Sequence, residues 1–126
     1  MMKKLIAAGL MLLAVGQVAA AEFKPFSRAE FDALQKAGKP VLVDVYADWC
    51  TVCRRQEKEL KIILQEPQFK QVTALKLDFD AQKQELPAFK VNNRSTLILF
   101  NKGKEVRRVV GETDPQRLRQ FMTLPR

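Results

Sequence analysis

The segment Asp44–Gln56, which reads DVYADWCTVCRRQ, holds both cysteines of a chain of 126 residues, with two residues between Cys50 and Cys53. The letters VLVDVYA over 41–47 form an apolar, β-branched run that predicts a buried strand. After Cys50, apolar residues recur every three or four positions and predict a helix to about residue 65. The cysteines therefore stand where a buried strand leads into a helix, and open α/β sheets place their functional sites at such ends of strands.

Outside this segment, helix patterns and strand patterns alternate along the chain. A capping box from Ser27 to Glu30 opens a helix that ends near Gly38. The other expected elements are strands over 72–77, 96–100 and 105–110, a hairpin turn over 101–104, a weak helix over 82–89 and a final helix that begins at Asp114. This order predicts an α/β domain with a central mixed sheet flanked by helices on both faces.

The first 21 residues have a different character. Two lysines at positions 3 and 4 precede an apolar run over 5–15 and a stretch rich in small residues over 17–21. This is the layout of a secretory signal peptide, so we expect cleavage after Ala20 or Ala21 and one domain over 22–126. An uncleaved membrane anchor is the alternative, although the apolar run is shorter than the roughly 20 residues of a spanning helix.

The charge of the chain is basic, with a formal net charge of +8. Residues 1–21 hold two of the 22 basic residues and none of the 14 acidic ones, so residues 22–126 keep 20 basic residues, 14 acidic residues and a net charge of +6. The basic residues are interspersed with acidic ones, and no aromatic residues interleave the arginine pairs at 54–55 and 107–108. The pattern favours a solvated basic surface over nucleic-acid binding.

The close spacing of the cysteines argues for redox chemistry. Disulfides persist in exported proteins, but a bridge between Cys50 and Cys53 closes a very short loop, which constrains the unfolded chain least. A structural zinc site needs four ligands, mostly cysteine and histidine, and the chain has two cysteines and no histidine. We therefore expect no metal and no other cofactor. A metal- or cluster-bridged dimer, with two cysteines from each chain, is the alternative.

The helix start gives the two cysteines different expected roles. A helix N-terminus favours negative charge, and it lowers a cysteine pKa from about 8.5 to between about 3.5 and 7.5. Cys50 is therefore expected to be the exposed, attacking thiolate. Cys53, one turn later, is expected to be the more buried thiol that resolves the mixed disulfide. Trp49 is expected to shield the pair and to offer a flat apolar contact.

Asp44 is an acidic residue inside the predicted buried strand, where a carboxylate is costly unless it has a partner. It either lies at a sheet edge and faces water, or it is a buried group of raised pKa that exchanges a proton with Cys53. We favour the second interpretation. Lys76, in the strand expected over 72–77, is the candidate partner of Asp44.

These residues give the chain a resemblance to the thioredoxin family along almost all of residues 22–126. The letters WCTVC over 49–53 stand where thioredoxins carry their W-C-x-x-C site, and Asp44, Lys76 and Gly111 match the buried aspartate, its neighbouring lysine and the glycine beside the site. The letters YADWC, EKEL and EPQF look closest to the C-terminal thioredoxin-like domain of the bacterial transmembrane thiol:disulfide interchange reductase. The resemblance implies a thioredoxin fold and dithiol exchange with protein disulfides.

One position departs from the family pattern. Thioredoxins carry a cis-proline just before the threonine of the third strand, and in NNRSTLILF over 92–100 that position is Ser95. Ser95 either has a trans peptide bond, which reshapes the groove, or bears the cost of about 2.5–4 kcal/mol of a non-proline cis bond. Its N–H and its hydroxyl, both absent from proline, could each reach a thiolate or a bound peptide. The expected substrate groove consists of Trp49, Arg94, Ser95, Thr96 and Gly111.

Together these features predict an exported thiol–disulfide oxidoreductase of protein substrates, and the resemblance favours a reductant. Two alternatives use the same residues: a periplasmic disulfide oxidase, and a binding module that captures peptides or thiols and turns over slowly because of Ser95. We expect a monomer in the periplasm, or one anchored in the membrane and facing the periplasm if the leader is retained. We also expect a membrane-bound redox partner and no nucleic-acid partner.

Overall fold

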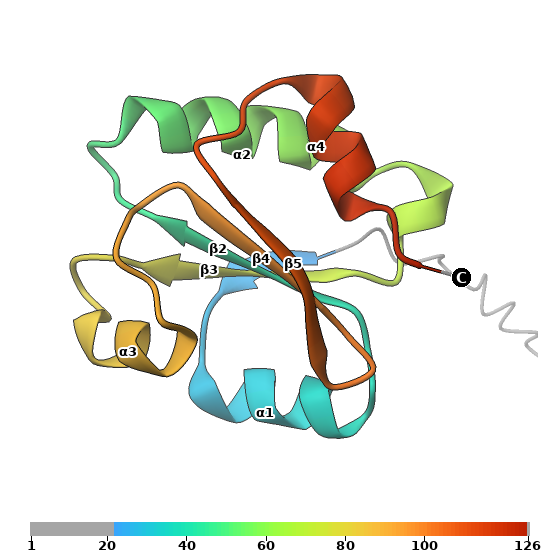
Figure 1. Cartoon of the computed structure of the whole chain (residues 1–126), viewed down its shortest axis with the longest axis horizontal. Coiled ribbons are helices and arrows are strands. Elements are labelled where there is room, and N and C mark those ends of the chain that lie inside the picture. Colours follow the sequence, from blue (N-terminus) through green and yellow to red (C-terminus); the bar gives the residue numbers. More distant parts are fainter. Residues whose placement is uncertain (1–21, 126) are drawn as a thin grey trace, which may run out of the picture.

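A mixed sheet of five strands, in the order β1-β3-β2-β4-β5, forms the centre of the computed structural model, which describes residues 22–125 (Figure 1). β1, β3 and β2 run parallel, whereas β4 is antiparallel to β2 and β5 is antiparallel to β4. The strands are β1 (Glu22–Pro25), β2 (Val41–Tyr46), β3 (Thr73–Asp78), β4 (Thr96–Asn101) and β5 (Lys104–Val110). The expected signal peptide over 1–21 lies outside the described residues.

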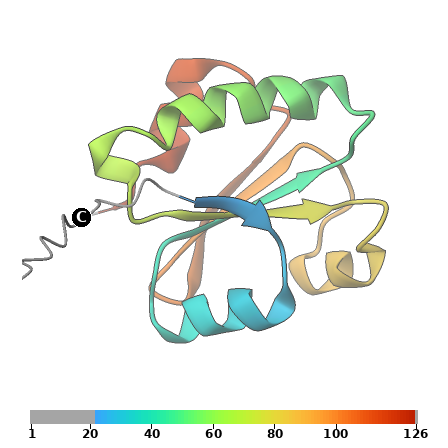
Figure 2. The ribbon, with the colours of Figure 1, turned by 180° about the vertical axis from the view of Figure 1, so that it is seen from behind.

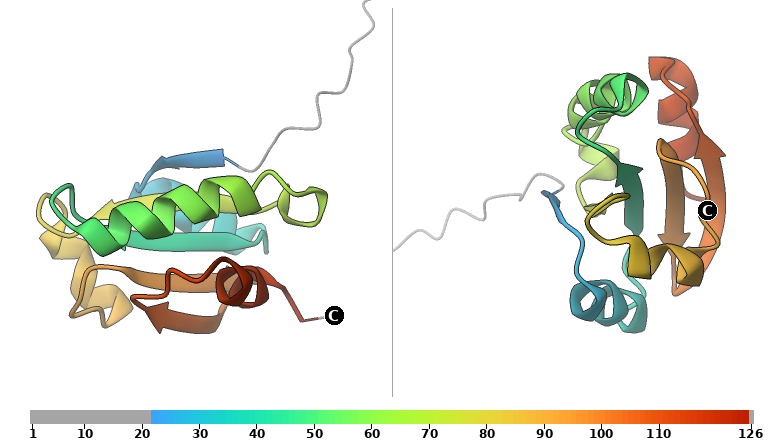
Figure 3. Two further views of the ribbon diagram at one scale, coloured as in Figure 1. Left: turned by 90° about the horizontal axis from the view of Figure 1, so that it is seen from above. Right: turned by 90° about the vertical axis from the view of Figure 1, so that its left-hand side faces the viewer.

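Helices cover both faces of the sheet (Figures 1 and 2). α2 (Thr51–Ile63) and α4 (Pro115–Met122) lie on one face, and α1 (Arg28–Lys36) and α3 (Leu86–Phe89) lie on the other, as the end view in Figure 3 also shows. The predicted α/β architecture, a central mixed sheet flanked by helices on both faces, is confirmed. No helix within residues 22–125 has both the length and the apolar character needed to cross a membrane.

Alternation along β2 divides the core between the two faces and fixes the direction of Asp44. Val43 and Val45 belong to the apolar cluster on the side of α1 and α3, whereas Leu42 belongs to the cluster on the side of α2 and α4. Successive side chains of a strand point to opposite faces, so Asp44 shares the face of Leu42. Its carboxyl group therefore lies on the side of α2, the helix that carries the cysteines.

Two elements differ from the sequence prediction. β1 was not predicted, because four residues that end in proline carry no alternating pattern of their own; it forms by pairing with β3. The expected helix over 82–89 is divided into the 3₁₀ helix η2 (Lys83–Glu85) and the four-residue α3. Pro87 has no N–H to donate, so it fits only in the first turn of α3, where it lies. A second 3₁₀ helix, η1 (Pro67–Phe69), follows α2.

Candidate active site

The carboxyl end of β2 and the first turn of α2 hold the redox pair. A disulfide joins the sulfurs of Cys50 and Cys53. Cys50 is the N-cap of α2, and its Sγ accepts a hydrogen bond of 3.1 Å from the backbone N–H of Cys53. The free N–H groups of a helix N-terminus stabilise negative charge. Reduction of the disulfide therefore leaves the Cys50 sulfur where a thiolate is favoured.

Both cysteines are buried, and the expectation of an exposed Cys50 is wrong. The exposed fraction is 6% for Cys50 and 3% for Cys53. Ala47 and Tyr46 pack against the pair, and the buried Ser95 contacts both sulfurs from the loop before β4. A substrate disulfide must therefore approach Cys50 closely, with its own chain against the residues around the pair.

Ser95 has a trans peptide bond, like every residue within 22–125, and a positive φ of 62°. Its backbone is held on three sides. The N–H of Ser95 donates to the carbonyl of Val45 at 2.8 Å, and the carbonyl of Ser95 accepts from the N–H of Gly111 at 2.9 Å and from Nε2 of Gln56 at 3.0 Å. The expectation that the Ser95 N–H could reach a thiolate or a peptide is therefore wrong, because β2 already uses that donor.

The hydroxyl of Ser95 faces the redox pair. Its Oγ lies 3.4 Å from Sγ of Cys50 and 3.3 Å from Sγ of Cys53. One side chain thus contacts both reacting atoms. Of the two donors that distinguish serine from proline here, only the hydroxyl is directed at sulfur.

Asp44 lies in the central strand β2, between β3 and β4, and its burial is confirmed by an exposed fraction of 1%. A position at the sheet edge is excluded. Neither carboxyl oxygen has a hydrogen-bond partner among the described residues. Burial, helped by the charge of Glu57 and opposed by the charge of Lys76, raises the pKa of Asp44 from 3.8 to about 7. Asp44 can therefore gain or lose a proton near neutral pH, as a proton-exchanging group requires.

Lys76 is aligned with Asp44 across the pairing of β2 with β3, but its ion pair is with another residue. Nζ of Lys76 donates to Oε1 of Glu57 at 2.7 Å and lies 4.3 Å from the centre of the Tyr46 ring. The sequence analysis did not identify Glu57 as part of the site. Its position four residues after Cys53 places both on the same face of α2, and that spacing was the available signal.

The Glu57→Gln variant should lower the pKa of Asp44 below about 7, because it removes an anion that raises this pKa. It also leaves Lys76 without the carboxylate to which it donates. Carbon-13 NMR titration of the Asp44 carboxyl measures the change directly. Glu59→Gln, a neutralisation on the same helix, serves as the control and should leave the titration unchanged. An equal or higher pKa in Glu57→Gln would contradict this arrangement.

Trp49, Arg94 and Asp80 form a cluster at the surface beside the disulfide. Trp49 is 56% exposed, and its Nε1 donates to Oδ2 of Asp80 at 2.7 Å. The guanidinium carbon of Arg94 lies 4.2 Å from the centre of the indole ring, a cation–π contact. Nε of Arg94 is buried without a hydrogen-bond partner, and its guanidinium makes no ion pair with any described residue. Within residues 22–125, the positive charge next to Ser95 therefore forms no ion pair with a carboxylate.

Thr96 and Gly111 complete the surroundings of Ser95. Oγ1 of Thr96 donates to the carbonyl of Asn93 at 2.6 Å, so this hydroxyl holds the loop. Gly111 has a φ of 76°, a value that favours glycine, and apart from its chain neighbours no heavy atom of residues 22–125 lies within 4 Å of the place where its Cβ would stand. The space beside Gly111 is thus open, whereas the Thr96 side chain is buried.

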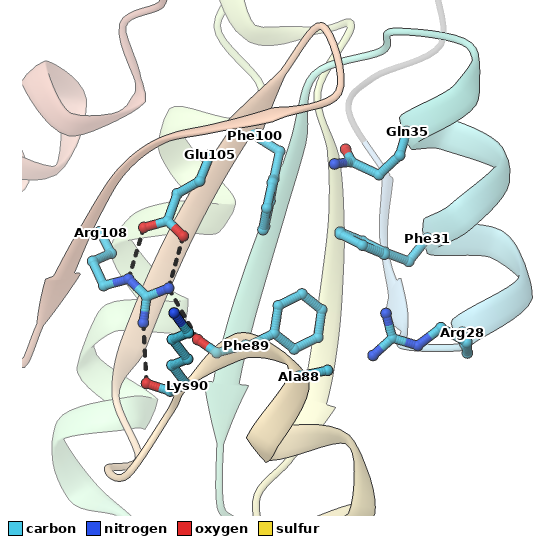
Figure 4. A pocket seen from close by; sticks show the side chains of 9 residues that line it. All are labelled: Arg28, Phe31, Gln35, Ala88, Phe89, Lys90, Phe100, Glu105 and Arg108. Carbon is cyan, nitrogen blue, oxygen red and sulfur yellow. Dashed lines mark hydrogen bonds and ion pairs between the residues drawn. The ribbon is translucent and has the colours of Figure 1, made fainter.

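A separate pocket of about 280 Å³ lies between α1, α3 and β5, among Phe31, Phe89 and Phe100 (Figure 4). None of the predicted site residues lines it. Arg108 on its wall donates to Glu105 and to the carbonyls of Phe89 and Lys90, as Figure 4 shows. The guanidinium of Arg108 is therefore hydrogen-bonded to the protein itself. The candidate active site remains the surface around Cys50 and Cys53.

Comparison with known proteins identifies the family. Residues 22–124 match the thioredoxin family. A thioredoxin from Chlamydia muridarum (strain MoPn / Nigg) is 44% identical over 78 residues, which cover 62% of this chain and 74% of that protein. A thioredoxin from Chlamydia pneumoniae is 37% identical over 100 residues, 79% of this chain and 91% of that protein.

A solved structure supports the same assignment. The crystal structure of Trxlp from Edwardsiella tarda EIB202 has a TM-score of 0.80 and 48% sequence identity, with 82% of this chain and 100% of that chain covered. The chain belongs to the thioredoxin family and is a thiol–disulfide oxidoreductase.

Proposed function

We propose that this protein is an exported reductant of protein disulfides that acts in the periplasm. The observation that carries dithiol exchange is the Cys50–Cys53 disulfide at the start of α2, on the face of the sheet that also holds the buried Asp44, whose pKa is raised to about 7. The leader-like residues 1–21 support export. The resemblance to the C-terminal domain of the interchange reductase supports a reductant that receives its electrons from a membrane-bound donor.

The proposed reaction proceeds in two displacements. The Cys50 thiolate attacks one sulfur of the substrate disulfide, forms a mixed disulfide and releases the first substrate thiolate. Cys53 then gives its proton to Asp44 and attacks the Cys50 sulfur, which releases the second substrate thiolate. The substrate gains two electrons, and the Cys50–Cys53 pair loses two. A dithiol donor restores the pair and itself becomes a disulfide.

The proposed substrate groove is formed by the surface around Ser95. Trp49 offers an exposed ring, and the space beside Gly111, whose N–H donates to the Ser95 carbonyl, is open. Arg94 contributes a cation that no carboxylate of the described chain neutralises. These features favour an extended peptide with an acidic residue next to its cysteine. We expect the protein to act as a monomer.

Arg94→Gln should reduce kcat/KM about tenfold for a peptide disulfide with glutamate beside the cysteine, because a hydrogen bond to a charged group is worth about 1.5–3 kcal/mol. For the same peptide with glutamine in place of glutamate, the substitution should reduce kcat/KM much less. Steady-state kinetics with the two peptides measure the difference. Arg55→Gln removes an exposed arginine of α2 and is the matched control. Equal losses for both peptides would show that Arg94 does not recognise the acidic group.

An oxidase of folding proteins is the second candidate, and one observation favours it. The Ser95 hydroxyl contacts both sulfurs, and a donor that stabilises a thiolate favours the dithiol form. A pair that strongly prefers the dithiol form oxidises its substrates. A binding module that holds a mixed disulfide for long periods would use the same contact.

Insulin reduction and cell fractionation together test the proposal. With dithiothreitol as electron donor, the purified chain should accelerate the reduction of insulin disulfides and release the bound peptide rapidly. A long-lived mixed disulfide with the wild-type chain would favour the binding module instead. Expressed at full length in a Gram-negative host, the chain should be recovered from the periplasm with residues 1–20 or 1–21 removed. Recovery of the intact chain in the cytoplasm would contradict export.

A further inference from the structure

We propose that Ser95 is a catalytic residue whose hydroxyl donates a hydrogen bond to the Cys50 sulfur in the dithiol form, and that Gln56 is the positioning residue that directs this hydroxyl. The two residues together would set the balance between dithiol and disulfide. This inference rests on the proposed dithiol exchange at Cys50 and Cys53. It assigns roles to a side chain that replaces the family's proline and to a glutamine outside the W-C-x-x-C motif.

The backbone of Ser95 is fixed by the three hydrogen bonds that join it to β2, to Gly111 and to α2. They hold Ser95 at a φ of 62°, a conformation that residues with a side chain rarely adopt. At this φ the Oγ lies 3.4 Å and 3.3 Å from the two sulfurs. The hydrogen bonds that hold the unusual backbone conformation of Ser95 therefore also hold its hydroxyl against the two sulfurs.

Gln56 connects the redox helix to this loop. Its exposed fraction is 0%, and its Nε2 donates to the Ser95 carbonyl at 3.0 Å. Its Oε1 is buried without a hydrogen-bond partner in the described residues. A buried polar atom without a partner is destabilising, and leucine would fill a similar volume without that cost. The one side-chain hydrogen bond that Gln56 makes within residues 22–125 points to a role in holding Ser95.

The chemistry of reduction explains why a hydroxyl at this place matters. When a dithiol donor reduces the pair, two electrons enter the S–S bond and the donor becomes a disulfide. Of its two protons, one goes to Cys53 and one to solvent, and Cys50 is left as a thiolate. The thiolate accepts from the N–H of Cys53 and, in our proposal, from the Ser95 hydroxyl. Hydrogen bonds to an ionised acceptor are about twice as strong as neutral ones, so the hydroxyl favours the dithiol form.

Ser95→Gly removes the hydroxyl and keeps the backbone conformation, because glycine adopts a positive φ readily. We expect the equilibrium with glutathione to shift about tenfold toward the disulfide, which corresponds to about 30 mV for a two-electron couple. The second measurement uses Cys53→Ala, where Cys50 is the single thiol. With Ser95→Gly added, the thiolate absorbance of Cys50 should titrate at a pH about one unit higher than with Ser95 in place. Asp44, Glu57 and Lys76 remain in place, so the charges around the pair are unchanged.

Gln56→Leu should shift the same equilibrium in the same direction by a smaller factor. In the Ser95→Gly background it should have no further effect, since the hydroxyl that it positions is gone. This double-mutant cycle separates a positioning role from a general effect on packing. Lys102→Gly, at the other end of β4 in the β4–β5 turn with a φ of 54°, is the matched control for glycine at a positive φ. It should leave the equilibrium unchanged.

Two results would overturn the inference: a Ser95→Gly chain with the wild-type equilibrium and titration, or a Gln56→Leu effect of full size in the Ser95→Gly background. If Ser95→Gly does not fold, Ser95→Ala, which also lacks the hydroxyl, provides the same comparison. Insulin reduction by the wild-type chain is measured separately. Its absence would contradict the proposed function, whereas normal insulin reduction with an unchanged Ser95→Gly equilibrium would contradict only this inference.

Discussion

Cys50→Ser should abolish disulfide exchange. A serine hydroxyl is a weak nucleophile without an adjacent base, and the chain contains no histidine to activate it. In general a helix N-terminus lowers the pKa of a thiol, but it does not bring a hydroxyl into the range where an anion forms. Insulin reduction in the presence of dithiothreitol should therefore fall to the rate without protein. A Cys50→Ser chain with the wild-type rate would show that Cys50 is not the attacking residue.

Cys53→Ser is the matched variant, and it should separate attack from resolution. The Cys50 sulfur remains at the N-cap of α2, so attack on a substrate disulfide continues. The resolving thiol is absent, so a mixed disulfide should accumulate with one substrate chain on each protein molecule. Mass spectrometry of the acid-quenched reaction should find this product for Cys53→Ser and not for Cys50→Ser. The reverse pattern would exchange the roles of the two cysteines.

At pH values above about 7, Asp44→Asn should raise the free energy of unfolding by an amount on the order of 4 kcal/mol. Unfolded Asp44 loses its proton near its usual pKa of 3.8, whereas folded Asp44 keeps its proton up to about 7. Between these values the native state binds more protons, so the stability of the wild-type chain falls as pH rises. Asparagine carries no charge and avoids that loss.

The pH dependence of this gain in the free energy of unfolding distinguishes a titration of Asp44 from a general effect on packing. The difference between Asp44→Asn and wild type should be small near pH 4, grow up to about pH 7 and stay constant above it. Chemical denaturation of the oxidised proteins at a series of pH values measures it. Asp32→Asn, an exposed position in α1, is the control and should show no such trend. A gain that is largest at low pH would mean that burial does not raise this pKa.

The same variant should slow the resolving step. General acid–base catalysis contributes about 10²–10⁴-fold, so loss of the Asp44 carboxylate should slow release of the mixed disulfide by about 10²-fold near pH 8. In the wild type the rate of release should fall as pH drops below about 7, because Asp44 becomes protonated. Trp49 is the only tryptophan of the chain and lies beside the pair, so its stopped-flow fluorescence follows the step. An unchanged rate in Asp44→Asn would exclude Asp44 as the proton acceptor.

The fold and the position of the redox pair could be predicted from the sequence because both depend on local patterns. The period of apolar residues changes from strand to helix at Cys50, and that change alone places the cysteines at the end of β2. The burial of Asp44 also follows from its place in an apolar run. These features require no knowledge of which segments meet in space.

The resemblance indicated which residues surround the pair, but their conformation and hydrogen bonds could not be predicted, because these depend on contacts between distant segments. Ser95 takes its conformation from hydrogen bonds to Val45, Gln56 and Gly111, and no local pattern encodes a positive φ there. The burial of Cys50 follows from that loop. Lys76 was the predicted partner of Asp44, but its ion pair is with Glu57 of α2, a contact between segments that the strand pattern does not reveal.

The reduction potential of the Cys50–Cys53 pair, measured by equilibration of the purified chain with glutathione, tests most directly whether this protein is a reductant. Our account predicts a value near the −270 mV or so that is typical of a reducing dithiol. Such a value means that the pair needs a supply of electrons and passes them to substrate disulfides. A value near about −120 mV, typical of a strong disulfide donor, would contradict the account and make the protein an oxidase.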